Sequence, residues 1–418
     1  MIKLTRRSLL LAGAGAAAAA ALPGSLGAQS REPRRAPDVI VVGAGVFGVW
    51  TARKLQEAGE RVTLIDAWGP AHARASSGGE SRMTRGSYGA DEVYTRMALD
   101  SLTDWQALSG RAGLPIFHQT GVLFFFSQAE SFLDETMRVH RRLGLPTELL
   151  ETAEMRRRFP QIDFTGALAG LYEPGFGALM ARRAVQTLFA EFLRAGGTYH
   201  QKQIRAVQPS GAALLAVTAT DGTRYQAERF VFACGPWLGR VFPELLGRRI
   251  FPTRQEVFFF APQAGDDRFE LGRLPGWADF NGGDIYYGFP NLEGRGFKIA
   301  HDAHGAPMDP DTGDRVPSAS ALADARAFMA RRFPPLADRP LSEARVCQYE
   351  NSSNGDLLID RHPTLQNVTL VGAGSGHGFK HGPAVGRYAA ELALGRLGTP
   401  EPRFSLATKA EQENRAVH

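Results

Sequence analysis

A glycine-rich turn near the start of the chain constrains the fold more than any other feature. Gly43-Ala44-Gly45-Val46-Phe47-Gly48 fits the pattern G-x-G-x-x-G, and it lies between an apolar run at 38–42 and a helical pattern closed by Gly59. The first glycine allows a tight turn, the second lets the backbone approach a pyrophosphate, and the third lets helix and strand pack closely. The sequence therefore predicts a βαβ unit whose helix begins at Val46 and faces phosphates.

The second strand of this unit ends in an acidic residue. Residues 61–66 form another apolar run, and Asp66 lies 18 residues beyond Gly48. A carboxylate at this position accepts hydrogen bonds from a ribose. The turn, the helix and Asp66 together indicate a dinucleotide site, but they fit FAD and NAD equally well. An ordinary βα turn is the alternative interpretation.

The rest of the chain contains two kinds of segment. Apolar strand candidates at 230–233 and 368–371 each run into a glycine turn, as the first strand does. Aromatic runs at 124–126 and 258–260, and the hairpin-like turn Asn281-Gly282-Gly283-Asp284, are typical of a mixed sheet. The predicted fold is α/β, with a Rossmann-like nucleotide-binding domain and an inserted α+β substrate domain built on a mixed sheet.

Composition and charge exclude several classes of protein. The chain has 418 residues, of which 44% are hydrophobic and 22% charged, as is ordinary for a globular protein. Beyond residue 28 it has 45 basic and 43 acidic residues, so we expect no nucleic-acid partner. Its two cysteines exclude a disulfide framework, and no Cys/His cluster has zinc-ligand spacing, so we expect no metal.

The N-terminal segment has the pattern of an export signal. Thr5-Arg6-Arg7-Ser8-Leu9-Leu10 resembles a twin-arginine signal, an Ala-rich run covers 16–21, and Leu26-Gly27-Ala28 offers a cleavage site. We expect residues 1–28 to be a signal peptide and the protein to be periplasmic or otherwise exported. An ordinary secretory leader or an uncleaved anchor is the alternative. No later stretch reaches the roughly 20 apolar residues that span a bilayer.

Four further segments make the sequence more specific. They are Ser76-Ser77-Gly78-Gly79-Glu80-Ser81-Arg82-Met83-Thr84-Arg85; Tyr286-Tyr287-Gly288-Phe289-Pro290 with Gly296-Phe297-Lys298; Arg345-Val346-Cys347-Gln348-Tyr349; and Val371-Gly372-Ala373-Gly374-Ser375-Gly376-His377-Gly378-Phe379-Lys380-His381-Gly382-Pro383. With these segments the sequence resembles the monomeric sarcosine oxidase and N-methyltryptophan oxidase group of the D-amino-acid-oxidase-like flavoproteins. The resemblance covers nearly the whole chain after the leader.

The resemblance implies FAD as the cofactor and a discontinuous arrangement of domains. Three segments would form the FAD-binding domain: 37–113, 166–245 and 346–400. Two would form the substrate domain: 114–165 and 246–345. Residues 29–36 would be a linker and residues 401–418 a C-terminal tail.

The resemblance also assigns roles around the reacting groups. Arg85 and Lys380 would hold the substrate carboxylate, for which the planar fork of Arg is well suited. Lys298 would reach the flavin and activate oxygen, because a preplaced cation stabilises the charge that develops there. Tyr287 and Tyr349 would line the substrate pocket. For Arg85 and Lys298 the alternatives are a basic surface loop and a solvated strand lysine.

Further residues are implied to contact the cofactor. Cys347 would attach FAD covalently, as a thioether to the 8-methyl carbon of its ring, whereas an inert buried cysteine is the alternative. Cys234 matches no such pattern and is expected to be structural. Arg82 and His377 would lie near the ring. The other residues expected at FAD, beyond the first glycine motif and Asp66, are Ser76, Ser81, Ile204, Gly235, Trp237, Gly374, Gly376, Gly378, Phe379 and Lys380.

Asp302 departs from the family pattern. Counted from Lys298, it occupies the position at which sarcosine oxidase has an active-site histidine. Sarcosine is therefore not carried over as the substrate. We expect Asp302 either to shift the preference for the amine or side chain, towards a cationic group, or to be a loop residue that faces water.

The predicted activity is that of an FAD-dependent oxidase of an amino acid or N-methyl amino acid. It would oxidise the carbon–nitrogen bond to an imine and reduce O2 to H2O2. A dehydrogenase that passes electrons to a quinone or redox partner, a non-catalytic flavin-binding envelope protein and an NAD-dependent dehydrogenase are the alternatives. The expected partners are an amine that bears a carboxylate, and O2, and the protein is expected to be a monomer.

Overall fold

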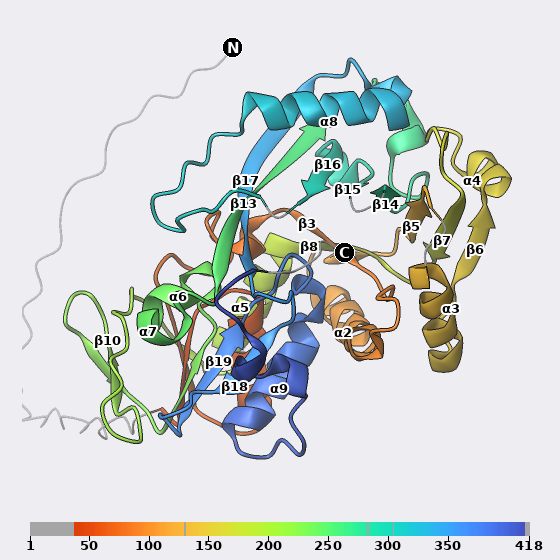
Figure 1. Cartoon of the computed structure of the whole chain (residues 1–418). Helices are drawn as coiled ribbons and strands as arrows, with labels where there is room; N and C mark the ends of the chain where they lie inside the picture. The colour runs from red at the N-terminus through yellow and green to blue at the C-terminus, as the bar shows by residue number, and fades with distance from the viewer. Residues whose placement is uncertain (1–36, 129–130, 282–283, 304, 414–418) are drawn as a thin grey trace, which may run out of the picture. The chain divides into compact units, whose positions relative to one another are not determined.

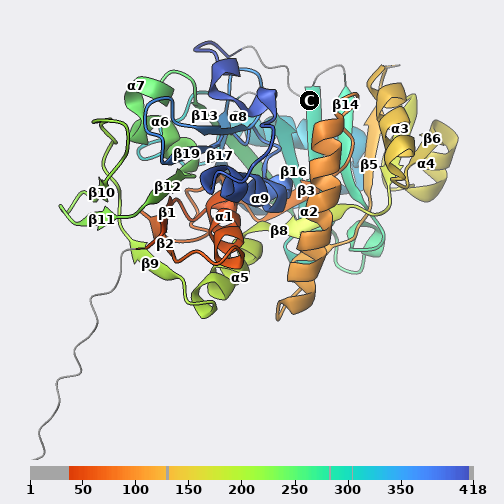
Figure 2. The same ribbon diagram turned by 90° about the horizontal axis from the view of Figure 1, so that it is seen from below.

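The predicted βαβ unit forms the centre of a six-stranded sheet (Figure 1 shows the whole chain, and Figure 2 labels the strands and helix of the unit). Strand β1 (Val39–Val42) pairs in parallel with β2 (Val62–Asp66), and helix α1 (Val46–Glu57) connects them. Every residue of β1 is buried, as expected of a strand inside a parallel sheet that is covered on both faces. The remaining strands of this sheet are β9 (Thr198–Gln201), β12 (Arg229–Phe232), β18 (Leu358–Arg361) and β19 (Val368–Gly372).

The computed structural model describes four stretches of the chain: 37–128, 131–281, 284–303 and 305–413. They belong to one compact unit that begins at Ala36. The predicted signal peptide and linker lie outside the described residues. Within the four stretches, no helix is both long and apolar enough to cross a membrane.

Helices α1 and α9 (Gly382–Ala393) pack against the six-stranded sheet, with α5 (Ala181–Arg194) beside α1 (Figure 2). The close approach of α1 and α9 depends on Gly386, since a Cβ there would lie 2.7 Å from the backbone carbonyl carbon of Trp50. Helix α2 (Glu92–Arg111) packs on α9. This layer fixes α1, and so holds its N-terminus at the carboxyl end of β1.

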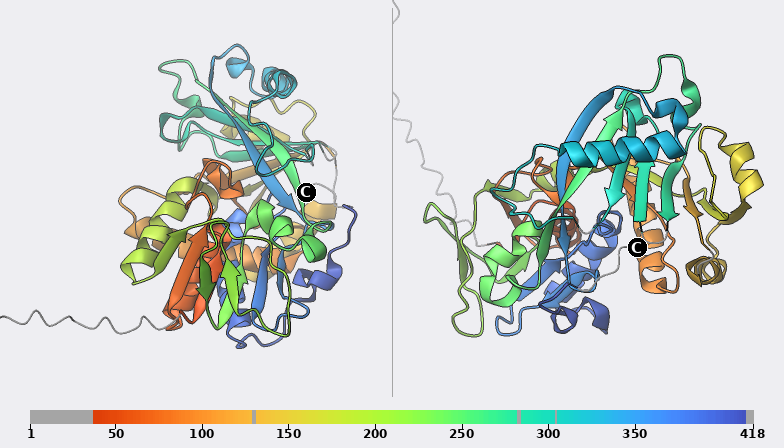
Figure 3. Two further views of the ribbon diagram at one scale, coloured as in Figure 1. Left: turned by 90° about the vertical axis from the view of Figure 1, so that its left-hand side faces the viewer. Right: turned by 45° about the horizontal axis from the view of Figure 1, so that its top comes forward.

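An eight-stranded mixed sheet forms the second part of the fold, in the order β17-β13-β16-β15-β14-β5-β7-β6. Its pairs are antiparallel except for β14 with β5. Helix α8 (Ala319–Arg332) lies across it (Figure 3). The strands are β5 (Val122–Phe126), β6 (Glu148–Glu151), β7 (Ala169–Glu173), β13 (Phe251–Phe260), β14 (Gly276–Asn281), β15 (Asp284–Phe289), β16 (Phe297–Asp302) and β17 (Leu341–Asn351).

Two strands do not fit the domain boundaries expected from the sequence. Strand β7 falls in the segment assigned to the FAD-binding domain, yet it pairs with β5 and β6. Its Leu171 packs with Phe124 and Phe126 in one core cluster, and this burial ties β7 to the eight-stranded sheet. Strand β17 spans the expected boundary between 345 and 346, pairs with β13 along its length and contains Cys347 and Tyr349.

The remaining strands and helices lie outside the two large sheets. A three-stranded sheet contains β3 (Ser81–Thr84), β8 (Gly177–Met180) and β4 (Phe117–His118), and β10 (Ala216–Thr218) pairs with β11 (Arg224–Gln226). The other helices are α3 (Ser131–Leu143), α4 (Thr152–Arg158), α6 (Leu238–Val241) and α7 (Pro243–Leu246). The described part of the predicted C-terminal tail packs on the domain, since Ser405 Oγ and Leu406 N donate to Asp360 Oδ2 at 2.9 and 2.8 Å.

Candidate functional site

Two cavities adjoin at the carboxyl end of the six-stranded sheet. The first, of about 360 Å³, is lined by the glycine-rich turn and by Asp66, and we call it the nucleotide cavity. The second, of about 530 Å³, is lined by the eight-stranded sheet and by the loop after β3, and we call it the chamber. Arg82, Tyr349, Gly376 and Phe379 line both. A group that fills the nucleotide cavity therefore borders the chamber.

The turn of the nucleotide cavity has the geometry that its glycines predict. Gly43 has φ +107°, and a Cβ there would lie 2.2 Å from Ala233 O. A Cβ on Gly48 would lie 1.8 Å from Gly43 O, so the third glycine packs helix on strand. Val46 N, at the start of α1, donates to Ser77 Oγ at 3.1 Å.

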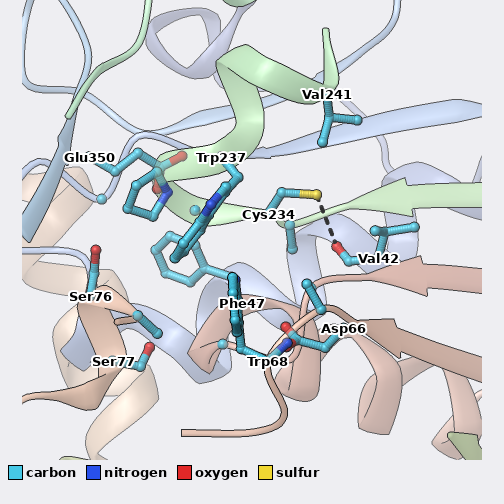
Figure 4. Close-up of a pocket in the computed structure, with 18 of the residues that line it drawn as sticks. Val42, Phe47, Asp66, Trp68, Ser76, Ser77, Cys234, Trp237, Val241 and Glu350 are labelled. Carbon is cyan, nitrogen blue, oxygen red and sulfur yellow. Dashed lines mark hydrogen bonds between the residues drawn. The ribbon is translucent and has the colours of Figure 1, made fainter. Parts of the chain in front are cut away.

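The carboxylate of Asp66 is fixed at the end of β2 (Figure 4). Its Oδ2 accepts from Ala44 N at 2.7 Å, and its Oδ1 accepts from Trp68 N at 2.8 Å and Gly69 N at 2.7 Å. A carboxylate has about four acceptor positions, so a ribose hydroxyl can still donate to it. Ser76 Oγ also lines this cavity and is buried without a hydrogen-bond partner among the described residues. These groups fit a bound dinucleotide.

Most residues predicted at the cofactor line the nucleotide cavity. Those that do are Gly43, Gly45, Val46, Asp66, Ser76, Arg82, Ile204, Gly235, Trp237, Gly374, Gly376, Gly378 and Phe379. His377 and Lys380 line the chamber instead. Gly48, Ser81 and Cys347 line neither: Gly48 lies beneath the turn, Ser81 faces Lys298, and Cys347 lies behind Arg82.

Replacing Gly48 with alanine should displace the turn and weaken FAD binding. The added Cβ would meet backbone that cannot move alone, and overpacking of this kind costs about 1–3 kcal/mol. We expect the affinity for FAD to fall about 10- to 100-fold, measured by titrating apoprotein with FAD. Gly110→Ala is the control, because nothing lies within 4 Å of a Cβ at that helical glycine. Equal affinity in both variants would show that the turn tolerates a side chain.

Arg82 connects the nucleotide cavity to Cys347. Its guanidinium donates to Ser76 O and, at 2.8 Å, to Ser81 O, and its Nη2 lies 3.6 Å from Cys347 Sγ. Both cysteines are free, and Cys347 is buried. Cys234 Sγ contacts Val42 O at 3.5 Å, and burial raises the pKa of the Cys234 thiol, so it stays protonated.

The chamber contains two basic side chains, of which Lys380 is buried and Arg85 is half-buried. The Arg85 guanidinium lies 4.1 Å from the centre of the Tyr88 ring, and Lys380 Nζ lies 5.0 Å from the same ring. Arg85 donates to Ser87 O, and Lys380 donates to His377 O at 2.9 Å. Burial, and then the Arg85 charge, lower the pKa of Lys380 well below its usual value. Neither cation forms an ion pair within the described stretches, which leaves both available to an anion.

Lys298 is buried rather than solvated, so that alternative is wrong. Its side chain is 1% exposed, and Nζ donates to Ser81 O at 3.0 Å and to Ser81 Oγ at 3.2 Å. The ring of Phe289 lies 5.4 Å from Nζ. Burial, and then the Arg82 charge, lower the pKa of Lys298 to about 7. A buried lysine with such a pKa changes its charge near neutral pH.

Asp302 is part of the chamber wall and is not a loop residue. It is the last residue of β16, it is half-buried, and its Oδ1 accepts from Tyr349 Oη at 3.1 Å. Tyr287 and Tyr349 line the chamber beside it, as predicted for pocket walls. Burial raises the pKa of Tyr287 to about 12, so its hydroxyl remains a donor.

Sequence reasoning missed a network behind Arg85. Glu173 is fully buried; its carboxylate accepts from Ser87 Oγ at 2.5 Å and from Gly86 N at 3.1 Å. Burial raises the pKa of Glu173 above its usual range. The bonds fix the loop that follows Arg85. The only sign of this network in the sequence was the position of Glu173, an acidic residue at the end of an apolar run.

Two further groups were also missed. Tyr88 Oη lies 3.1 Å from His377 Nδ1 and 2.8 Å from His381 Nε2. Glu350 lines the nucleotide cavity, and burial raises the pKa of its carboxyl to about 8. Neither Tyr88 nor Glu350 belongs to a recognisable motif, because the residues around each of them are distant in sequence.

The Rossmann-like sheet and the glycine-rich turn are those of a dinucleotide-binding protein, and the adjoining chamber carries two basic side chains that form no ion pair with described residues and could receive an anion. Comparison with known proteins resolves the class further. The chain belongs to the DAO family of FAD dependent oxidoreductases, whose family model matches residues 38–392. The match confirms FAD as the cofactor and excludes the NAD alternative.

Individual relatives agree with this family. The chain is 31% identical over 367 residues to the monomeric sarcosine oxidase of Bacillus sp. strain B-0618, covering 85% of this chain and 92% of that protein. It is 29% identical over 379 residues to the N-methyl-L-tryptophan oxidase of Yersinia pestis strain Pestoides F, covering 88% and 98%. The solved L-proline dehydrogenase of P. horikoshii has the same fold, with a TM-score of 0.78 at 20% identity over 89% and 97% of the two chains. The predicted resemblance and fold class are confirmed.

Proposed function

We propose that the protein is an oxidase that converts an amino acid or N-methyl amino acid to an imine and reduces O2 to H2O2. The observation that carries the proposal is the pair Arg85 and Lys380, half-buried and buried and without an ion pair among the described residues, in a chamber that borders the nucleotide cavity. A carboxylate matches the two cations in charge and in hydrogen-bonding geometry. The relatives named for sarcosine and N-methyl-L-tryptophan oxidation also support an amino-acid substrate.

The chain contributes position and charge to this reaction. Arg85 and Lys380 would hold the carboxylate, which directs the adjacent carbon and nitrogen towards the wall shared with the nucleotide cavity. FAD held by the residues that line the nucleotide cavity would supply the hydride acceptor for that carbon. The amine gives up a proton, and water hydrolyses the imine product. Lys298 supplies a buried cation for the transfer of two electrons and two protons to O2.

Anaerobic reduction by a panel of amino acids tests the proposal. N-methyl, cyclic and primary amino acids are mixed with the holoenzyme without oxygen, and loss of the flavin absorbance is followed. Oxygen uptake matched by equal H2O2 would support the oxidase. Bleaching that only an added quinone or dye reverses would instead identify a dehydrogenase. A flavin that no amine bleaches would contradict both and point to a non-catalytic protein.

We further propose that FAD is attached covalently through Cys347, whose Sγ lies 3.6 Å from Nη2 of Arg82, a residue that lines both cavities. After acid precipitation, yellow colour should stay with the wild-type protein, and Cys347→Ser should release nearly all of it to the supernatant. Cys234 also lines the nucleotide cavity, so Cys234→Ser is the matched control; it should retain the colour, because the Cys234 thiol contacts Val42 O and burial raises its pKa, which keeps it protonated. Colour in the wild-type supernatant would show that the flavin is not covalently bound.

We also propose export by the twin-arginine route, which rests on the sequence of residues 1–28. This route carries proteins that have folded with their cofactor.

We propose a monomeric enzyme.

A further inference from the structure

The chamber wall formed by the eight-stranded sheet contains a single charged group. Five strands contribute to this wall, with Phe124 from β5, Ala278 and Phe280 from β14, Ile285 and Tyr287 from β15, Asp302 from β16 and Tyr349 from β17. Of these seven residues, only Asp302 has a carboxylate or basic side chain. Arg85 and Lys380 reach the same chamber from the loop after β3 and from the segment after β19.

Strand register explains why Asp302 faces the chamber. Asp302 pairs with Ile285, and Ile285 pairs with Phe280, so these side chains form one row across three strands. Tyr287 and Ala278 form the neighbouring row, two residues along each strand. Because side chains two residues apart share a face of a sheet, both rows face the chamber. Asp302 therefore ends an otherwise apolar row.

The surroundings of Asp302 suit a cation. Tyr349 Oη donates to Oδ1 at 3.1 Å, which orients the carboxylate, and Asp302 forms no ion pair with any described residue. The rings of Tyr287 and Tyr349 line the chamber next to it. Aromatic rings combined with a carboxylate form a favourable environment for an ammonium or guanidinium group.

That cation is not the reacting amine. The amine must be neutral to give up a hydride equivalent from its carbon, and a fixed carboxylate beside it would stabilise its protonated form. The substrate carboxylate is accounted for by Arg85 and Lys380. A chamber of about 530 Å³ leaves room for a side chain beyond these groups.

We propose that Asp302 determines specificity by binding a second cationic group, so that the substrate is a basic amino acid. The inference rests on the proposed function, since it places the reacting carbon between Arg85–Lys380 and the nucleotide cavity. An apolar stem would lie along Phe280 and Ile285, with its cationic end at Asp302.

Pairs of substrates that differ in charge but little in shape test the proposal. Anaerobic reduction of the holoenzyme is compared for lysine against norleucine and for arginine against citrulline, using both enantiomers. The measured quantity is the ratio of the reduction rate constant to Kd. Because a hydrogen bond to a charged group is strong, this ratio should be about 10- to 100-fold higher for the cationic member of each pair than for the neutral one. Asp302→Asn should lower this ratio by a similar factor, and Asp302→Glu should retain most of it.

Asp284→Asn is the matched control, because Asp284 lies on the same sheet but is exposed and pairs with His301 at 2.5 Å. FAD content and circular dichroism establish that each variant is folded. A wild-type ratio near or below one, or a ratio unchanged in Asp302→Asn, would overturn the assignment. If neutral amino acids reduce the flavin and basic ones have no advantage, only this inference fails. If no amino acid reduces it, the proposed function fails.

Discussion

Replacing Lys298 with methionine should slow the reaction of the reduced enzyme with O2 about 100- to 1,000-fold. Anaerobic reduction by the amino acid should change only a few-fold. Methionine keeps the length of the side chain and removes the charge that would stabilise electron transfer to oxygen. The two half-reactions are separated by stopped-flow absorbance, first without oxygen and then after mixing with oxygenated buffer.

The pH dependence gives the same prediction a second readout. Burial, and then the Arg82 charge, lower the pKa of Lys298 to about 7. Lys298 is therefore cationic below this pH and neutral above it. The oxygen reaction of the wild type should slow as pH rises through about 7, and the methionine variant should not show this step. Lys54→Met is the control, because this half-buried lysine of α1 pairs with Glu57 and lines neither cavity. An unchanged oxygen rate in Lys298→Met would show that Lys298 does not activate oxygen, whereas a slow oxygen reaction in the wild type itself would identify the dehydrogenase.

Local sequence was sufficient to predict the residues of the nucleotide cavity. Gly43, Gly48 and Asp66 act through the turn that contains them and the strand that follows, so their roles depend on few distant contacts. Burial of apolar strands likewise made β1, β2, β12 and β19 predictable. The mixed sheet followed from its aromatic runs and from a hairpin turn.

The environment of the chamber could not be predicted in the same way. A shift of one residue in the register of β16 would turn Asp302 away from the chamber, and register depends on pairing with β15. From the sequence alone, Asp302 could therefore equally well be a loop residue or a residue of the pocket. Glu173 lies 86 residues from Ser87, so their hydrogen bond follows only from the packing of the folded chain.

The second large effect is expected at Arg85. Arg85→Gln should lower kcat/KM for an amino acid about 100- to 1,000-fold, because truncating one partner of a buried charge pair costs about 2–5 kcal/mol. Most of the loss should appear as a higher Kd for the substrate, measured by anaerobic titration. Arg96→Gln, an exposed arginine on α2 that pairs with Glu92, is the control.

The amide of the same amino acid distinguishes loss of a carboxylate site from general damage. In the wild type the amide should react much more slowly than the acid, since it cannot accept from both Arg85 and Lys380 as a carboxylate does. In Arg85→Gln the difference between acid and amide should shrink, because Lys380 alone remains. Glu173 holds the loop next to Arg85 in both proteins, so the scaffold stays the same. If acid and amide lose activity equally, Arg85 supports the chamber structurally and the carboxylate binds elsewhere.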